Sequence, residues 1–242
     1  MSYADITTNE KNRLKRWLQN RRLDDALVYP QRQGFSRTGG TALDFGGGDA
    51  GLSRRIEERF SGYRPYCYEP SSEIRAEATA ACAGTEVSIV GSLEDLGATQ
   101  FDFVTCCEVF EHLPDAQADA ALDEMKRLCA DDGVIIIGVP NEIFLVGLLK
   151  GFFRMTRRYG AYDARWGTVL AAASGRPRTD RPVLAIDGLP FIYPHTGFDY
   201  RQLIARLRRH GLQVVMSYGS PFRRGPRWLN SEIYLVARRS PV

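Results

Sequence analysis

From residue 41 onward, short apolar runs alternate with segments whose apolar residues recur at helical spacing. Such runs predict strands, and the amphipathic segments between them predict helices. The predicted strands are 41–45, 64–69, 86–90, 101–106 and 133–139. The predicted helices are about 51–60, 72–82 and 115–130, the last carrying Leu122, Met125 and Cys129. Short apolar strands that alternate with helices are typical of a parallel sheet covered on both faces.

The pattern changes after Pro140-Asn141-Glu142. Residues 143–190 form an insertion that is first apolar and basic, then rich in Gly, Pro and Arg. From Asp199 the i, i+3, i+4, i+7 spacing of apolar residues predicts a helix that His210-Gly211 ends. Strands at about 212–218 and 231–238 follow. The connection between them is too short for a parallel crossover, so we expect them to be antiparallel.

The first 40 residues do not follow the strand–helix alternation. Thr7-x-x-Glu10 is a capping box that opens a basic helix at about 8–28, and residues 29–40 are predicted to be a loop. We therefore divide the chain into an N-terminal helical extension, 1–40, and one domain, 41–242, that contains the insertion.

Composition agrees with one cytoplasmic α/β domain. The chain has 242 residues, of which 44% are hydrophobic, enough for one large core. The run Ile143–Leu149 is far too short to span a bilayer, and the N-terminus has no secretory apolar segment. The five cysteines form no Cys-x-x-Cys pair. They are interpreted as reduced thiols, with Cys67, Cys106 and Cys129 in the core.

Charge is unevenly distributed along the chain. Residues 41–132 hold 19 acidic and 7 basic residues, whereas the rest hold 10 acidic and 25 basic ones. One interpretation is solvated helix faces. The other is an electropositive rim that favours an anionic substrate or surface. Nucleic acid is not the favoured partner, because no compact Lys/Arg block with interleaved aromatic residues occurs.

The run Leu43–Gly51 predicts a buried strand, a glycine turn and the start of a helix. Glycines there allow a ligand to approach the backbone, and the helix N-terminus faces that ligand. Asp44 precedes the turn, where it would repel a pyrophosphate but suit a cationic amine. Glu69 ends the next strand 25 residues after Asp44 and is placed to accept hydrogen bonds from ribose hydroxyls. Asp44 could instead be a turn or helix cap.

Five segments in order resemble the motifs of the class I S-adenosylmethionine-dependent methyltransferases of types 11 and 23. They are Asp44–Gly51, Glu69-Pro70, Val90–Leu96, Phe101–Pro114 and Asp132–Asn141. The resemblance implies a doubly wound, Rossmann-like α/β fold with a seven-stranded, mostly parallel sheet whose last strand is antiparallel. It also implies S-adenosyl-L-methionine as cofactor and S-adenosyl-L-homocysteine as product.

The same resemblance implies which residues bind the cofactor. They are Asp44, Phe45, Gly46, Gly47, Gly48, Glu69, Pro70, Ser92, Leu93 and Cys107. Asp44 and the glycine backbone would hold the amino-acid end, Glu69 the ribose, and Ser92 with Leu93 the adenine. Ser92 stands where many relatives have an acid and could simply cap a turn. Ala50 replaces a common glycine.

Candidate catalytic residues follow the predicted strands, where the sheet opens. They are Glu108, Glu111 and His112 after the fourth strand, and His195 before the last helix; Asn141 and Glu142 are further candidates. A neutral histidine can remove a proton from an acceptor hydroxyl, although both histidines could also be structural.

In a helical turn, Glu108, Glu111 and His112 would share one face and suit Mg²⁺, Mn²⁺ or Zn²⁺, with His195 as a fourth ligand. This resembles the Glu-x-x-Glu-His of ubiquinone-pathway and small-RNA methyltransferases that use a metal. Because Glu-His-Leu is also frequent in relatives with no known metal, a divalent metal is not favoured.

Residues 143–158 combine Leu and Phe with Lys and Arg. They could pack on the domain, form a lid over the acceptor, or contact an anionic membrane surface. The function expected is methyl transfer to oxygen on a small-molecule or saccharide-like acceptor, anionic or lipid-linked. The alternatives are a metal-assisted enzyme acting on RNA or a quinone precursor, and a non-catalytic cofactor-binding module.

Overall fold

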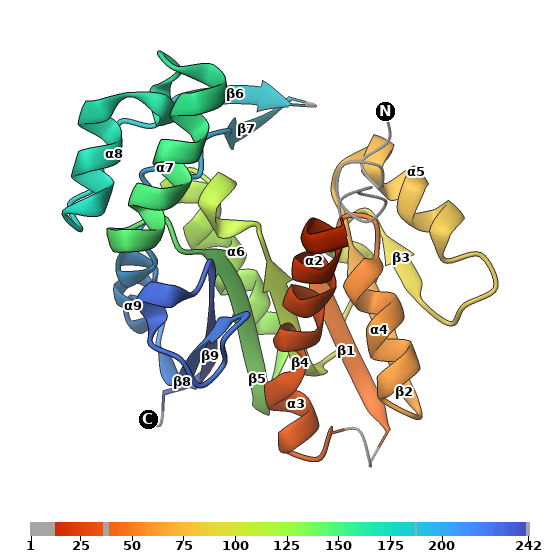
Figure 1. The fold of residues 1–242 in the computed structure, drawn as a ribbon. Coiled ribbons are helices and arrows are strands. Elements are labelled where there is room, and N and C mark those ends of the chain that lie inside the picture. Colours follow the sequence, from red (N-terminus) through yellow and green to blue (C-terminus); the bar gives the residue numbers. More distant parts are fainter. Residues whose placement is uncertain (1–12, 36–38, 187, 241–242) are drawn as a thin grey trace.

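The computed structural model describes residues 13–35, 39–186 and 188–240, and the structural statements below refer to these residues (Figure 1). The capping box at Thr7 and Glu10 lies outside them. The main-sheet strands are β1 (Gly40–Phe45), β2 (Tyr63–Tyr68), β3 (Ser88–Val90), β4 (Phe101–Cys107), β5 (Cys129–Pro140), β8 (Leu212–Ser220) and β9 (Glu232–Arg239). The helices around them are α2 (Arg13–Ala26), α3 (Val28–Arg32), α4 (Gly51–Arg59), α5 (Ser72–Ala81), α6 (Asp115–Leu128) and α9 (Tyr200–Arg209).

The seven strands form one sheet in the order β3-β2-β1-β4-β5-β9-β8. Strand β9 runs antiparallel to both of its neighbours, and the remaining pairs are parallel. The predicted doubly wound sheet and its antiparallel last strand are confirmed. The chain winds away from β1 in one direction and from β4 in the other. Their carboxyl ends therefore meet at a topological switch point, where ligands of such sheets bind.

Strand β5 shows why the sheet is covered on both faces. Ile135, Ile137 and Val139 pack in the core that α6 and α9 complete. Val134 and Ile136 pack in the core on the opposite face, under α2, α3 and α4. Continuous apolar runs of this kind are typical of a strand buried on both faces. Cys67, Cys106 and Cys129 are also buried, as predicted.

Two predicted boundaries are wrong. Residues 28–32 are helix α3 rather than loop, because Pro30 lies in its first turn, where a missing N–H costs no hydrogen bond. Cys129 belongs to β5, which begins four residues earlier than predicted, and not to the preceding helix. Its spacing from Met125 fits a helix, but Cys129 pairs with Phe101 of β4 in the sheet.

The insertion forms a separate layer, which we call the cap. It contains α7 (Phe144–Arg158), α8 (Trp166–Ala173) and the hairpin β6 (Val183–Ile186) and β7 (Leu189–Ile192). In Figure 1 the cap stands beyond the carboxyl end of β5, with α7 and α8 side by side. No helix in the described ranges is long and apolar enough to cross a membrane.

Candidate active site

Strand β1 ends at a glycine turn whose backbone is left-handed at three positions. The φ angles of Gly46, Gly48 and Ala50 are 72°, 58° and 57°. Glycine adopts this conformation readily, whereas alanine adopts it at a cost of roughly 1 kcal/mol. Ala50 therefore keeps the backbone shape that a glycine would take, and α4 begins directly after it.

Gly47 is the point of closest approach in this turn. A Cβ there would lie 2.5 Å from Sγ of Cys67 and 2.8 Å from Oδ2 of Asp44. The N–H groups of Gly46 and Gly47 donate to the carbonyl of Tyr68 over 2.8 and 3.1 Å, which ties the end of β1 to the end of β2. The turn is therefore fixed before any ligand arrives.

Asp44 is buried at the base of this turn. Ser53 Oγ donates to its Oδ2 over 3.1 Å, and Thr105 Oγ1 donates to its Oδ1 over 3.0 Å. Burial raises the pKa of Asp44 to about 7, although the two hydroxyl hydrogen bonds oppose the rise. A buried carboxyl with such a pKa is ready to ionise when a cation comes close.

Glu69 follows β2 and is also buried. Its Oε2 accepts from the N–H of Gly48 over 3.1 Å, and its Oε1 accepts from the N–H of Ser71 over 2.9 Å. Burial raises the pKa of Glu69, while these two N–H groups oppose the rise. The carboxylate is thus held beside the glycine turn, and each oxygen keeps a lone pair for a further donor.

Glu69 and four further predicted cofactor residues do not line the cavity that the turn faces. Phe45 is buried in the core, and Leu93 packs against the same core while partly exposed. Pro70 is exposed. Ser92 Oγ accepts a hydrogen bond from the N–H of Glu94 over 3.2 Å and donates to the Glu94 carboxylate. Ser92 thus caps the short turn that follows it.

A cavity of about 170 Å³ lies at the carboxyl ends of β1 and β4. Its lining includes four of the predicted positions or segments, namely Asp44, the turn Gly46–Gly48, Cys107 and Glu108. It also includes Arg22, Glu232 and Tyr234, which sequence reasoning did not find. Arg22 was one of many basic residues in its helix, and no motif surrounds Glu232 or Tyr234.

Arg22 brings the N-terminal helix α2 into this cavity. Its Nη2 lies 2.6 Å from Oε2 of Glu108, and its Nε lies 3.1 Å from Oε2 of Glu232. Tyr234 Oη donates to the Arg22 carbonyl over 2.6 Å. Burial would raise the pKa of Glu108, but Arg22 and a hydrogen bond from Glu232 lower it to about 2. Burial raises the pKa of Glu232 well above its usual range. The Arg22 guanidinium thus contacts two carboxyl groups, ionised Glu108 and protonated Glu232.

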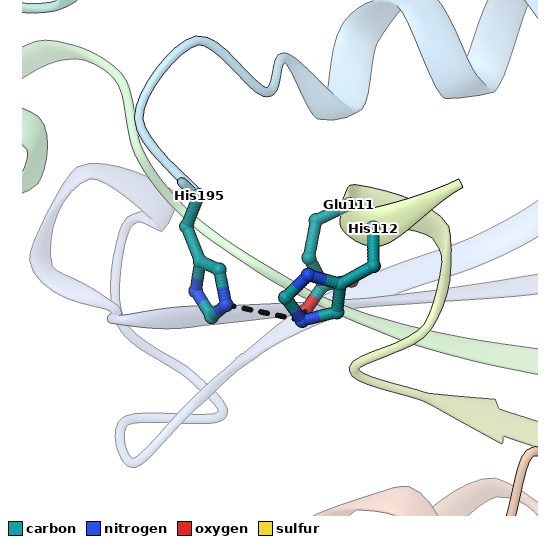
Figure 2. Close-up of side chains that lie close together, drawn as sticks. All are labelled: Glu111, His112 and His195. Carbon is teal, nitrogen blue, oxygen red and sulfur yellow. Dashed lines mark hydrogen bonds and ion pairs between the residues drawn. The ribbon is translucent and has the colours of Figure 1, made fainter. Parts of the chain in front are cut away.

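The expected helical turn through Glu108, Glu111 and His112 is wrong. Glu108 has a φ of 57°, and the 3₁₀ turn begins only at Phe110. Glu108 therefore faces Arg22 in the cavity. Figure 2 shows the other two residues converging on His195, which comes from the loop after β7.

Buried Glu111 and half-buried His112 and His195 form a cluster, with one ligand atom from each lying within 4.8 Å of the others. The Nε2 atoms of the two histidines are 3.2 Å apart, and Nε2 of His112 is 3.9 Å from Oε1 of Glu111. No other described residue donates a hydrogen bond to the Glu111 carboxylate. Burial lowers the pKa of His112 and lowers that of His195 to about 4, so both rings are neutral at pH 7.

The tautomers of these histidines follow from their partners. Nδ1 of His112 lies 2.8 Å from the carbonyl of Ile192, which can only accept, so that nitrogen carries the proton. Nε2 of His112 then holds a lone pair and accepts from Nε2–H of His195. The free lone pair of this two-histidine unit is therefore Nδ1 of His195.

Asn141 and Glu142, the further candidates, have structural partners. The Asn141 amide donates to the carbonyls of Arg227 and Asn230, each over 3.1 Å. Buried Glu142 is 2.9 Å from both Lys150 Nζ and Arg154 Nη2 of α7. These contacts attach the cap to the sheet.

Comparisons with known proteins agree with this geometry. A family model described as a methyltransferase domain matches residues 14–216. A search of curated protein sequences finds no match.

Three solved structures with similar folds are methyltransferases. Magnesium protoporphyrin IX methyltransferase from Synechocystis, with bound S-adenosylhomocysteine, has a TM-score of 0.61 at 17% identity, covering 96% of this chain and 89% of that one. A methyltransferase from Clostridium acetobutylicum has a TM-score of 0.62 at 10% identity, covering 99% and 96%. The 1,6-didemethyltoxoflavin-N1-methyltransferase of Burkholderia thailandensis has a TM-score of 0.58 at 16% identity, covering 93% and 81%. With its family match, its sheet order and its glycine turn, the chain belongs to the methyltransferase-domain family and is a class I S-adenosylmethionine-dependent methyltransferase.

Proposed function

We propose that this methyltransferase acts on a hydroxyl oxygen of a small-molecule or saccharide-like acceptor that carries negative charge. The observation that carries the proposal is the neutral, half-buried pair His112 and His195, which lies next to buried Glu111. A hydroxyl must lose a proton as its oxygen gains the methyl group, and a neutral imidazole can accept that proton.

The residues around the cavity fit the cofactor by their chemistry. Asp44 would bind the ammonium group, and the turn at Gly46–Gly48 would lie against the amino-acid end. Glu69, which is hydrogen-bonded to the N–H of Gly48, would accept from the ribose hydroxyls. The absence of a Cβ at Gly47 lets the turn pack directly against Cys67 and Asp44. When bound, S-adenosylmethionine supplies an electrophilic methyl group, so the protein has to align the acceptor and remove its proton.

His195 is the residue that we assign as base. Its Nδ1 holds the free lone pair, while His112 orients the ring through the 3.2 Å contact between the Nε2 atoms. Glu111 lies 3.9 Å from His112, and burial raises the pKa of its carboxyl well above its usual range, so this group is protonated at neutral pH. The charge that would stabilise an imidazolium at His195 is that of ionised Glu108, which favours the protonated ring.

The negative charge of the acceptor is inferred from Arg181. Nη1 of this half-buried residue donates to the Glu111 carbonyl over 2.5 Å, which places a guanidinium next to the cluster. Arg181 also lines a second cavity of about 320 Å³, on the side of the cluster where α6 and α9 lie. A guanidinium there can pair with a phosphate or carboxylate of the acceptor.

The first experiment is transfer of labelled methyl from S-adenosylmethionine into lipid, saccharide, nucleic-acid and small-molecule fractions of a cell extract. A double variant, Asp44→Ala with Glu69→Ala, is the cofactor-site control. We expect label in the saccharide, small-molecule or lipid fraction, and none with the control. Label confined to nucleic acid would overturn the proposed acceptor class.

Once an acceptor is known, His195→Asn tests the base. General-base catalysis contributes on the order of a hundredfold to ten-thousandfold in rate, so we expect a loss of kcat in that range. His210→Asn is the matched control, because His210 pairs with Asp119 and Asp123 at the end of α9. Unchanged kcat in His195→Asn would remove the assigned role.

A metal-assisted reaction is the second candidate, and one observation favours it. The Glu111 carboxylate is fully buried without a donor from another described residue, and two imidazole nitrogens lie beside it. One carboxylate and two histidines can hold Zn²⁺ or Mn²⁺, and the bond from His112 to Ile192 resembles the outer contacts that orient metal ligands. A metal there would polarise the acceptor oxygen.

Titration calorimetry with Zn²⁺ and Mn²⁺ on chelator-treated protein separates the two candidates. Metal-assisted chemistry requires binding that Glu111→Gln weakens and His210→Asn leaves intact, together with activity that chelation abolishes. Full activity in the presence of chelator would leave His195 as a metal-free base.

A further inference from the structure

Helix α7 presents its most apolar side to solvent. Leu145, Leu149, Phe152 and Phe153 are all exposed, with 61% of Leu149 and 58% of Phe152 accessible. Their spacing of i, i+4, i+7 and i+8 places them on one side of the helix. We call these four residues the α7 stripe. Water normally contacts the polar side of an amphipathic helix, so a stripe of this kind marks a binding surface.

The opposite side of α7 is already occupied. Gly147 and Gly151 face α8, and a Cβ at Gly151 would lie 2.6 Å from Cγ1 of Val169. Lys150 and Arg154 turn inward to Glu142. Because the buried side of the helix is set by these contacts, the α7 stripe cannot rotate into the domain without breaking the two ion pairs.

The charges around the α7 stripe have one sign. Residues 143–176 contain six basic residues and one acidic residue, Asp163. Asp163 is buried under Arg158 and Arg154, so its charge is neutralised inside the cap. Arg157 has no acidic partner among the described residues, and its guanidinium lies 4.1 Å over the Phe153 ring at the edge of the stripe.

An exposed row of Leu and Phe with Arg157 at its edge is complementary to an anionic lipid surface, where acyl chains take up the apolar groups and headgroups pair with the cation. We propose that the α7 stripe docks this protein on anionic membranes. Helix α7, which carries the stripe, lies beyond the carboxyl end of β5, and the candidate site lies at the same end of the sheet (Figure 1). Resting on the proposed function, we further infer that the acceptor is amphiphilic and reached from the membrane.

Vesicle flotation tests the docking without any methyl transfer. The full chain is mixed with phosphatidylcholine vesicles that contain no or about a third phosphatidylglycerol, at low and at high salt. We expect binding to the anionic vesicles only, weakened by salt because the headgroup attraction is screened. Protein that stays unbound with anionic vesicles at low salt would overturn the proposal.

Matched variants locate the surface. Phe152→Ser should lower the partition constant at least about tenfold, because a Phe side chain leaves the acyl region. Phe222→Ser, at an equally exposed phenylalanine in the β8–β9 loop, should leave it unchanged. Arg157→Glu should weaken binding to anionic vesicles further than Arg157→Gln. Equal effects of Phe152→Ser and Phe222→Ser would refute the assignment.

The main rival occupant is a second copy of the chain. If light scattering shows a dimer that Phe152→Ser converts to a monomer, and neither form binds vesicles, the stripe is a dimer interface and the proposal fails. Methylated product is assayed separately in the organic phase of the extract. Vesicle binding without a methylated lipid product would refute the amphiphilic acceptor and support membrane docking. A methylated lipid product without vesicle binding would refute the docking and support the amphiphilic acceptor.

Discussion

Replacing Asp44 by Asn should abolish the pH dependence of cofactor binding near neutrality. Burial raises the pKa of Asp44 to about 7, so the carboxyl is protonated below pH 7 and ionised above it. Only the ionised form attracts an ammonium group. In the wild type, affinity for S-adenosylhomocysteine should therefore fall as the pH drops through 7.

The size of the effect follows from this pKa. With binding restricted to the ionised form, the apparent Kd should be about tenfold weaker at pH 6 than at pH 8, or about 1.4 kcal/mol. The Asp44→Asn variant would lack the charge-assisted hydrogen bond, worth about 1.5–3 kcal/mol, so it should bind about ten- to a hundredfold more weakly at pH 8. Its affinity should then stay constant down to pH 6.

Titration calorimetry between pH 6 and 8.5 measures both slopes. Asp49→Asn is the control, because Asp49 lines the same cavity but caps the first turn of α4; this variant should keep the wild-type slope. A wild-type affinity independent of pH, or the same slope in Asp44→Asn, would refute the reasoning. The ligand-free protein offers a second check. A carboxyl with a raised pKa contributes less to stability as pH rises from about 4 to 7, and Asp44→Asn should lose that decline.

Three further predictions concern unfolding free energies, measured by urea denaturation. Gly47→Ala should destabilise the protein and weaken cofactor binding, because its Cβ would lie within 3 Å of two side chains. The control is Gly167→Ala on α8, where a Cβ meets nothing within 4 Å; it should be neutral or stabilising by up to about 1 kcal/mol. A stable Gly47→Ala variant with intact affinity would contradict the turn geometry. Leu122→Ala should cost about 2–5 kcal/mol, since Leu122 is fully buried between α6 and the sheet; less than 1 kcal/mol would argue against this core. Arg22→Met should lower the free energy of unfolding by about 1–2 kcal/mol and reduce cofactor affinity, because Glu108 and Glu232 lose their shared cation. Partial contact of these groups with solvent limits the loss of stability. Unchanged stability and affinity would disprove the place of Arg22 in the cavity.

The fold could be predicted from the sequence because the apolar runs, the turn residues between them and the final sheet all agree. The run around Ile135 is buried on both faces, and each such run ends at a turn residue, which is what a parallel sheet requires. The errors fall where one residue fits two structures. Cys129 keeps helical spacing but joins a strand, and Pro30 suits a loop and the first turn of a helix equally well.

The candidate site could be predicted only where its residues are contiguous. Asp44 and the glycines of the turn follow one another, so their positions in space are set by local geometry. Arg22 and Glu232 come from opposite ends of the chain and meet only after β9 inserts beside β5. The backbone at Glu108 turned out left-handed, a conformation that a glutamate pattern gives no reason to expect.

The two ends of the cap meet. Thr196 Oγ1 donates to Oε2 of Glu142 over 3.3 Å, and Arg154 contacts both residues. When a long segment leaves and re-enters a sheet at adjoining points, its length adds little to the entropic cost of folding, because loop-closure entropy grows only slowly with length. The segment between these contacts, residues 143–195, contains the cap and also His195. A replacement segment would therefore change the acceptor contacts and the proposed base together, while the glycine turn and its buried aspartate remain as they are.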